Sequence, residues 1–315
     1  MNLRSILSRA PSRRSFLAGA GSAAALTLAG CGSNGSMPPT SAGGVTDADI
    51  LNFALNLEYL EAEFYLHAAT GSGLASADAG TSPGTVTGGA KVSGLSSAQQ
   101  NILNEIAYDE QEHVRFLRSA LGSSAVARPA IDLTNSFNAL ASAAGIGSTF
   151  NPFSSFDAFL VGAFIFEDVG VTAYNGAAPL ISKAGVTAGY LAAAGGIMAV
   201  EAYHAAYVRT SLTANATTQG TTAYPYFGYA NQVSALRASV GGGAETKLSI
   251  PSGTTTATTT VTPTSVVAAD SNALAYYRST DQVLHIVYGT GGGAGVKSGA
   301  FFPSGLNGKI SVTQS

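Results

Sequence analysis

Apolar residues recur every three to four positions in four stretches of the chain, the spacing that places them on one face of an α-helix. These stretches predict helices over residues 47–69, 97–121, 155–178 and 187–212. The predicted inner faces are Leu51, Leu55, Glu58, Ala62 and Tyr65; Leu103, Ile106, Glu110, His113 and Leu117; Leu160, Phe164, Glu167, Val171 and Tyr174; and Ala194, Ile197, Glu201, His204 and Val208. Each apolar face therefore carries ionisable side chains toward the core.

The connections indicate how the helices are arranged. Residues 70–95 are rich in Gly, Ser and Thr and are expected to form a loop without regular structure. Residues 122–153 form a second long connection, with one short helix near 134–143. A connection of that length can cross a bundle and leave the second and third helices parallel. We therefore expect a mainly α fold, a four-helix bundle over residues 47–215 with a long crossover between helices 2 and 3.

Residues 216–315 differ in character from the bundle. Residues 224–229 are expected to form an aromatic loop and 231–240 a short helix. Residues 246–268 and 283–288 are rich in β-branched and aromatic residues and predict strands. The pattern leaves open whether this small β-containing C-terminal extension stands apart or wraps over the bundle.

One chemical motif occurs twice along the bundle: a glutamate, a tyrosine seven residues later, and a Glu-x-x-His pair on the next helix. Its members are Glu58, Tyr65, Glu110 and His113 in the first half, and Glu167, Tyr174, Glu201 and His204 in the second. Residues three apart share a helix face, so each Glu-x-x-His pair points one way. Four glutamates and two histidines on four helices are the ligand set of a dinuclear metal site in a helical bundle.

Burial gives a physical reason to expect cations there. Carboxylates taken out of water lose their hydration and repel one another, which is very costly without positive charge between them. Carboxylate and imidazole ligands suit iron, manganese or zinc, and oxygen-rich sets with open positions favour redox-active metals. We therefore expect two Fe or two Mn ions. In the competing interpretation these residues are ordinary polar members of the core, and the tyrosines are ordinary core aromatics.

Other ionisable residues lie near the predicted ligands. Glu61 falls one turn from Glu58. The alternatives for it are an extra ligand and a residue at the rim of the site, and we favour the rim. Asp109 and Asp168 each neighbour a ligand and are candidates to hydrogen-bond the ligand histidines. Three further glutamates point to solvent by helical phase, and two histidines lack partners at ligand spacing. These residues are Glu63, Glu105, Glu112, His67 and His285.

Residues 1–31 have the anatomy of an export signal, with a basic stretch before an apolar run too short to span a bilayer. Residues 12–17, SRRSFL, resemble the twin-arginine signal, and residues 28–31, LAGC, resemble the lipobox of bacterial lipoproteins. Cys31, the only cysteine, would then be lipidated; the alternative is a cleaved signal with an incidental cysteine. Residues 32–46 are expected to be a flexible tether. We expect an exported periplasmic or cell-envelope protein, anchored to the membrane as a lipoprotein.

The motifs resemble those of the ferritin-like family. Residues 57–65, LEYLEAEFY, resemble its desiccation-related branch, and the Glu-x6-Tyr spacing is similar to that of bacterioferritins and rubrerythrins. The resemblance covers about residues 47–215. It implies that Glu110 and Glu201 bridge the metals and that Glu58 and Glu167 are terminal ligands. It also implies that His113 and His204 each bind one metal, and that Tyr65 and Tyr174 hydrogen-bond to the ligand carboxylates.

Two functions fit these residues. The first is a di-iron or di-manganese oxidoreductase of peroxidase, catalase or ferroxidase type, whose substrate is a small oxidant or a metal ion. The second is a non-catalytic, desiccation-related stress protein of the cell envelope that uses its metals structurally. Charged residues are only 10% of the chain and the net charge is −3, so nucleic acid is not an expected partner. The only membrane contact expected is through a lipid on Cys31, and the oligomeric state is not predicted.

Overall fold

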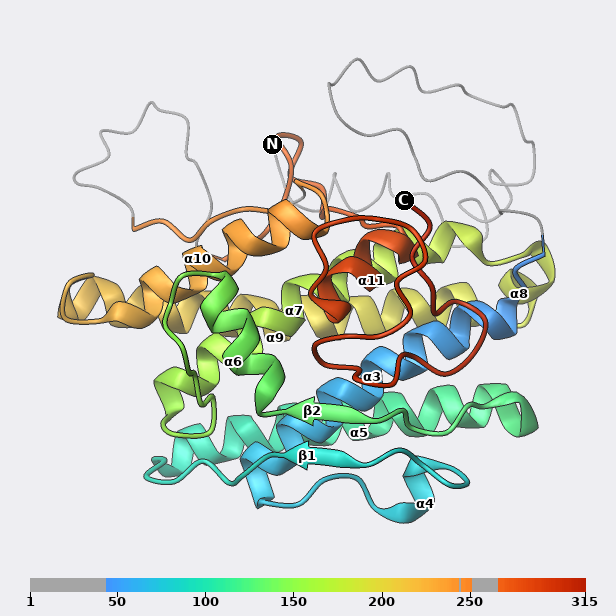
Figure 1. The fold of residues 1–315 in the computed structure, drawn as a ribbon, viewed down its shortest axis with the longest axis horizontal. Coiled ribbons are helices and arrows are strands. Elements are labelled where there is room, and N and C mark those ends of the chain that lie inside the picture. Colours follow the sequence, from blue (N-terminus) through green and yellow to red (C-terminus); the bar gives the residue numbers. More distant parts are fainter. Residues whose placement is uncertain (1–43, 244, 251–265) are drawn as a thin grey trace, which may run out of the picture. The chain divides into compact units, whose positions relative to one another are not determined.

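The computed structural model describes residues 44–243, 245–250 and 266–315. Within them, four long helices form a bundle (Figure 1): α3 (Asp47–Thr70), α5 (Ser97–Leu121), α7 (Phe156–Ala177) and α9 (Tyr190–Gln219). α3 packs along α5 and α7 along α9, and the two pairs meet where α3 contacts α7 and α5 contacts α9. The predicted mainly α four-helix bundle is confirmed. None of the described helices combines the length and the apolarity needed to cross a bilayer.

Local sequence signals set the ends of these helices. Thr46 caps α3 by exchanging hydrogen bonds with Asp49, and Ser96 caps α5 by the same exchange with Gln99. Gly71 ends α3 at a φ of 87°, a left-handed conformation in which glycine is favoured. α7 ends where expected, at a turn that contains a proline, but α9 continues beyond its predicted end at residue 212. The elements between α7 and α9 are η2 (Ala178–Leu180) and α8 (Lys183–Thr187).

The two long connections contain more regular structure than the sequence predicts. Their elements are α4 (Ser76–Ala79), β1 (Val86–Gly88), η1 (Gly122–Ser124), β2 (Ile131–Leu133) and α6 (Asn135–Ala143). α6 is the short helix expected near 134–143. β1 and β2 pair in parallel, with Val86 opposite Ile131, so the prediction of a structureless loop over 70–95 is wrong. Strands of three residues are too short to show a period in the sequence.

The described part of the extension contains two helices, α10 (Pro225–Val240) and α11 (Thr280–Tyr288). α10 begins earlier than the predicted short helix, inside the stretch expected to be an aromatic loop. The predicted strand over 283–288 is wrong, because these residues form the body of α11. Ser279 caps this helix, and a short apolar run cannot separate helix from strand by periodicity.

The other predicted strand lies largely outside the described residues, since 251–265 are not among them. Its flanks, 246–250 and 266–268, form no strand. The β structure of the described extension consists of isolated bridges between Ala269 and Ala275 and between Gly299 and Phe302.

The extension wraps over the bundle, the second of the two arrangements that the sequence leaves open. α11 packs against α7 (Figure 1), and the backbone N–H of Arg278 donates to the carbonyl of Thr172 at 3.0 Å. The ring of Phe301 lies edge-on to Phe166 and Phe137, with ring centroids 5.0 and 5.2 Å apart. Edge-to-face aromatic pairs of this kind add to the stabilisation from area burial.

A buried ion network fastens the extension to the bundle. Asp168 on α7 accepts hydrogen bonds from Arg209 of α9 at 2.9 Å and Arg237 of α10 at 3.2 Å. Glu245 accepts from Arg237 at 2.8 Å and from Arg278 at 2.7 Å. All three arginines are 1% exposed or less. Loss of one partner from such a network leaves a buried charge uncompensated.

Replacing Asp168 with asparagine keeps the side-chain shape but removes the charge that faces Arg209 and Arg237. We expect Asp168→Asn to lower the free energy of unfolding by about 3–5 kcal/mol. Asp78→Asn is the control, because its partner Arg115 has a side chain 43% exposed, and pairs of that kind contribute about 0–1 kcal/mol. Denaturant unfolding with a chelator present, followed by circular dichroism, measures both losses. Equal losses would contradict a special role for the network.

Candidate metal centre

The four helices of the bundle bring all six predicted ligands together. α3 and α7 each contribute one glutamate, and α5 and α9 each contribute a Glu-x-x-His pair. The exposed fractions are 0% for Glu58, Glu110 and Glu201, 1% for Glu167, 6% for His204 and 8% for His113. Each ligand occupies a position on the apolar inner face of its helix, so the packing that forms the bundle also assembles the cluster.

The first potential cation position lies between α3, α5 and α9. His113 Nδ1 is 3.2 Å from Glu58 Oε2 and 3.3 Å from Glu110 Oε2. It is 3.6 Å from Glu201 Oε1. These four residues each offer one ligand atom, and the atoms all lie within 4.8 Å of one another. Three carboxylates and one imidazole at this spacing suit a transition-metal ion.

The second potential position lies between α5, α7 and α9. His204 Nδ1 is 3.0 Å from Glu110 Oε1 and 3.7 Å from Glu167 Oε2, and these three residues form a set with the same spacing. Glu110 belongs to both sets and is placed to bridge two cations. Glu201 belongs only to the first set, so its bridging role stays a prediction.

Unsatisfied polar atoms test whether cations fit this cluster. Glu110 Oε1, Glu167 Oε2, both carboxylate oxygens of Glu201, and Nδ1 of His204 are buried without a hydrogen-bond partner in the described chain. Buried polar atoms are normally satisfied. These atoms belong to the two sets and carry lone pairs, which a cation would satisfy. The side chains therefore fit a metal site, and their chemistry does not choose between iron and manganese.

Burial and mutual repulsion shift the pKa values of the glutamates and histidines in this cluster. Burial raises the pKa of Glu201 and of Glu167, the latter to about 8. Burial also opposes ionisation of Glu110, but the facing imidazoles of His113 and His204 hold its pKa at about 2. Burial disfavours the charged histidines, yet the facing carboxylates raise the pKa of His113 to about 11 and of His204 to about 10. Protons thus neutralise the metal-free cluster, and cation binding would release them.

Two buried tyrosines brace the glutamates across the bundle. The hydroxyl of Tyr65 on α3 donates to Glu167 on α7, and that of Tyr174 on α7 donates to Glu58 on α3. Burial, and then the adjacent carboxylates, raise the pKa of both hydroxyls well above the usual range, so they remain donors. Hydrogen bonds of this kind fix the orientation of ligands. The contacts favour a bracing role over the alternative of ordinary core aromatics.

Of the two aspartates expected beside the histidines, one lies there. Asp109 Oδ2 is 3.2 Å from Nε2 of His204, the ring nitrogen directed away from the glutamates. An acceptor at Nε2 leaves the lone pair on Nδ1, toward the cluster. The same expectation for Asp168 is wrong. Its side chain faces the extension and binds Arg209 and Arg237 instead.

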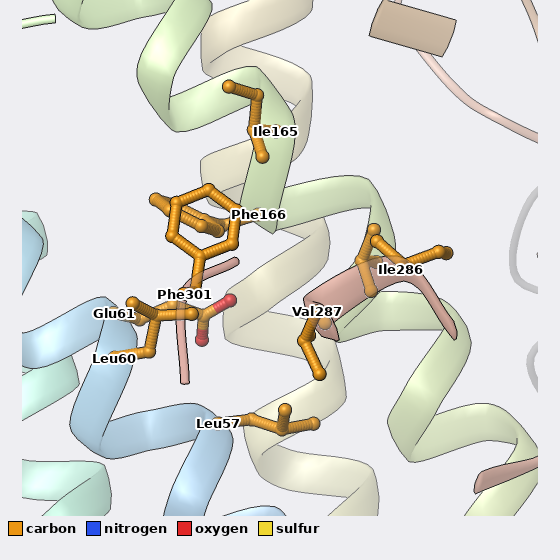
Figure 2. Close-up of a pocket in the computed structure, with 10 residues that line it drawn as sticks. Leu57, Leu60, Glu61, Ile165, Phe166, Ile286, Val287 and Phe301 are labelled. Atoms are coloured by element: carbon orange, nitrogen blue, oxygen red, sulfur yellow. The ribbon is translucent and has the colours of Figure 1, made fainter. Parts of the chain in front are cut away.

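Glu61 does not lie at the rim that we favoured from the sequence; it is buried, with 5% exposed. It lines a small cavity together with Ile286, Val287 and Phe301 of the extension (Figure 2). Burial, and then repulsion by the ligand glutamates, raises its pKa well above the usual range. The available signal was its position three residues after Glu58, the spacing of a shared helix face.

The remaining candidates lie away from the cluster. Glu63 is not solvated as expected; it is 1% exposed and paired with Arg128, which comes from the crossover. Glu105 is exposed, as predicted. His67 is half-buried, and His285 contacts the carbonyl of Ser315. Cys31 and the rest of the predicted signal lie outside the described residues.

Comparison with known proteins assigns the family. A family model described as Ferritin-like domain matches residues 46–214, which span α3 to α9. The chain belongs to the ferritin-like family. This confirms the resemblance seen in the sequence.

Two relatives of this ferritin-like chain align over most of its length. It is 30% identical over 275 residues to the ferritin-like catalase Nec2 of Nesocodon mauritianus, covering 84% of each chain. It is 29% identical over 266 residues to the desiccation-related protein PCC13-62 of Craterostigma plantagineum, covering 76% of each chain. Both alignments are longer than residues 1–214, so both take in part of the extension.

Changing either tyrosine to phenylalanine removes one hydrogen bond to a ligand glutamate and keeps the ring. We expect Tyr65→Phe and Tyr174→Phe each to weaken metal binding about 10–100-fold, measured by competition with a chromophoric chelator. Tyr59→Phe is the matched control, because Tyr59 is equally buried on α3 but its hydroxyl contacts Val126 and Arg118. Unchanged affinity in the first two variants would leave the tyrosines as plain core aromatics.

Proposed function

We propose that this ferritin-like protein binds a pair of iron or manganese ions and decomposes hydrogen peroxide with them. The observation that carries the proposal is an enclosed cluster of four glutamates and two histidines whose buried lone pairs lack partners. Peroxide as the substrate is supported by the relative named a ferritin-like catalase, with which this chain aligns over 84% of both lengths.

Two redox-active cations supply a two-electron couple, which can reduce one hydrogen peroxide to two waters and oxidise a second to O₂. The residues of the chain supply geometry. Glu110 lies between the two positions, and His113 and His204 face them from opposite sides with Nδ1. Asp109 holds His204 in that orientation. Because the side chains are already placed by helix packing, little reorganisation is needed when substrate arrives.

The enclosure also limits the substrate to small molecules. No ligand side chain is more than 10% exposed, and the helices around them are lined with aliphatic and aromatic residues. A buried apolar shell excludes bulk water from the reacting centre. Hydrogen peroxide is small and neutral, so it avoids the cost of burying a charge, and polar groups at the centre must replace the hydrogen bonds that it loses from water.

A second candidate is a structural use of the cations without turnover. It is favoured by the relative named a desiccation-related protein, and by the origin of the ligands on all four helices of the bundle. Cations bound there would hold the helices together and couple metal binding to folding. Chelation would then lower stability, and peroxide would not be consumed.

Metal content and oxygen evolution measured together separate the two candidates, and Glu110 tests the ligand assignment because it belongs to both ligand sets. We expect Glu110→Ala to lose both cations and all oxygen evolution from peroxide, and His204→Ala to weaken one cation, since its imidazole lies in one set only. Glu105→Ala, an exposed glutamate on the same helix, is the control. Elemental analysis and an oxygen electrode provide the measurements. Two cations in the unchanged protein without oxygen evolution would support the structural function.

We also propose that the protein is exported in folded form and anchored as a lipoprotein, on the basis of the SRRSFL and LAGC strings. Cys31→Ser is expected to move the protein from the membrane fraction to the soluble envelope fraction, because the lipid attachment atom is lost. Fractionation with antibody detection measures the shift. Replacing Arg13 and Arg14 by lysine should instead keep the protein in the cytoplasm. A Cys31→Ser variant that remains membrane-bound would refute the anchor.

A further inference from the structure

A small cavity lies between the bundle and the extension, beside the metal ligands. α3 contributes three residues to its lining, α7 four, and the extension three: Leu57, Leu60, Glu61, Ile165, Phe166, Val169, Gly170, Ile286, Val287 and Phe301. All of them are buried. The cavity is therefore an interior space whose outer wall is made by the extension.

Glu61 is the only polar side chain in this lining. Figure 2 shows its carboxylate oxygens directed into the space between Phe301, Leu57 and Val287. A water molecule is held well when it has two to four polar partners. Glu61 is the one side chain here that offers such a partner, so a small polar molecule in the cavity makes its side-chain hydrogen bonds to Glu61.

Gly170 connects this cavity to the cluster. A Cβ atom on Gly170 would lie 2.4 Å from Glu201 Oε2 and 3.4 Å from Glu61 Oε1. No side chain at this position therefore separates the cavity from a ligand carboxylate. The two halves of the repeated motif differ at this point. Glu61 is three residues after Glu58, and Gly170 is three residues after Glu167. One half of the bundle thus has an extra carboxylate at the position where the other half has no side chain.

The size of the cavity defines what it can hold. Its volume is about 20 Å³, and a cavity that holds one water needs at least about 10–15 Å³. A molecule with two heavy atoms fits, whereas a branched organic molecule does not. Glu61 can hydrogen-bond a small O–H donor, and the apolar walls accept a neutral molecule.

We propose that this cavity is the binding place of one peroxide-sized neutral molecule next to the cluster, and that the extension sets the size limit. The identity of the molecule as hydrogen peroxide rests on the proposed function; the existence of the site does not. Glu61 is its positioning residue, because it offers the only hydrogen-bonding group in the wall.

Variants of Val287 test the size limit, because this side chain belongs to the extension and none of the predicted metal ligands lines the cavity. Val287→Ala enlarges the space, and we expect turnover of tert-butyl hydroperoxide relative to hydrogen peroxide to rise about tenfold. Val287→Phe fills it, and kcat/KM for hydrogen peroxide should fall about tenfold or more with metal content unchanged. Val283→Ala is the control, because Val283 is equally buried on α11 but does not line the cavity.

Xenon binding gives a readout that needs no turnover, because enlarged apolar cavities take up noble gases. Xenon NMR of the full-length protein should show a bound site in Val287→Ala, whose cavity is larger, and none in Val287→Phe or Val283→Ala. If the protein holds metal but does not consume peroxide, the proposed function fails while the xenon result still decides the cavity. Absence of bound xenon in Val287→Ala, or a folded and metal-loaded Val287→Phe with undiminished peroxide turnover, overturns the inference. If Val287→Phe does not fold, Val287→Ala and the xenon measurement decide it.

Discussion

Repulsion between buried carboxylates is the constraint on which the rest of this structure depends. Five glutamates, the four predicted ligands and Glu61, lie in one region that water scarcely reaches. Helix packing forces them together, so only protons or cations can remove the repulsion. The unsatisfied lone pairs of Glu110, Glu167, Glu201 and His204 favour cations. Any cation that binds this cluster would therefore also stabilise the bundle.

The two halves of the bundle repeat a motif without being equivalent. Asp109, the residue before Glu110, braces a histidine, whereas the residue before Glu201 is a valine and cannot. Glu61 in one half corresponds to Gly170 in the other, where the missing side chain makes room for the Glu201 carboxylate. The two groups of potential ligands consequently have different donors and different surroundings.

The helices, and the clustering of the six candidate ligands, could be predicted because each depends on local periodicity. Glu110 and His113 share a helix face by spacing alone, and long amphipathic stretches define helices clearly. Glu61 could not be placed, because its burial comes from Val287 and Phe301, which are remote in sequence. The same is true of Asp168, whose arginine partners come from α9 and from the extension. The predictions for short elements such as β1 and α11 were wrong for another reason, since a few residues are too short a stretch to show a period in the sequence.

The extension is tied to the metal centre through α7. Adjacent residues on a helix point about 100° apart, so holding one side chain fixes the direction of the next. Asp168 is held by Arg209 and Arg237, and this turns the preceding residue, Glu167, toward the cluster. About two turns further, Gly176 lies directly against the backbone of Arg278, which sets how close the extension can pack. The extension thus helps to fix the rotation of α7, which carries Glu167, and it also forms the outer wall of the cavity. Neither feature follows from the sequence of the bundle alone.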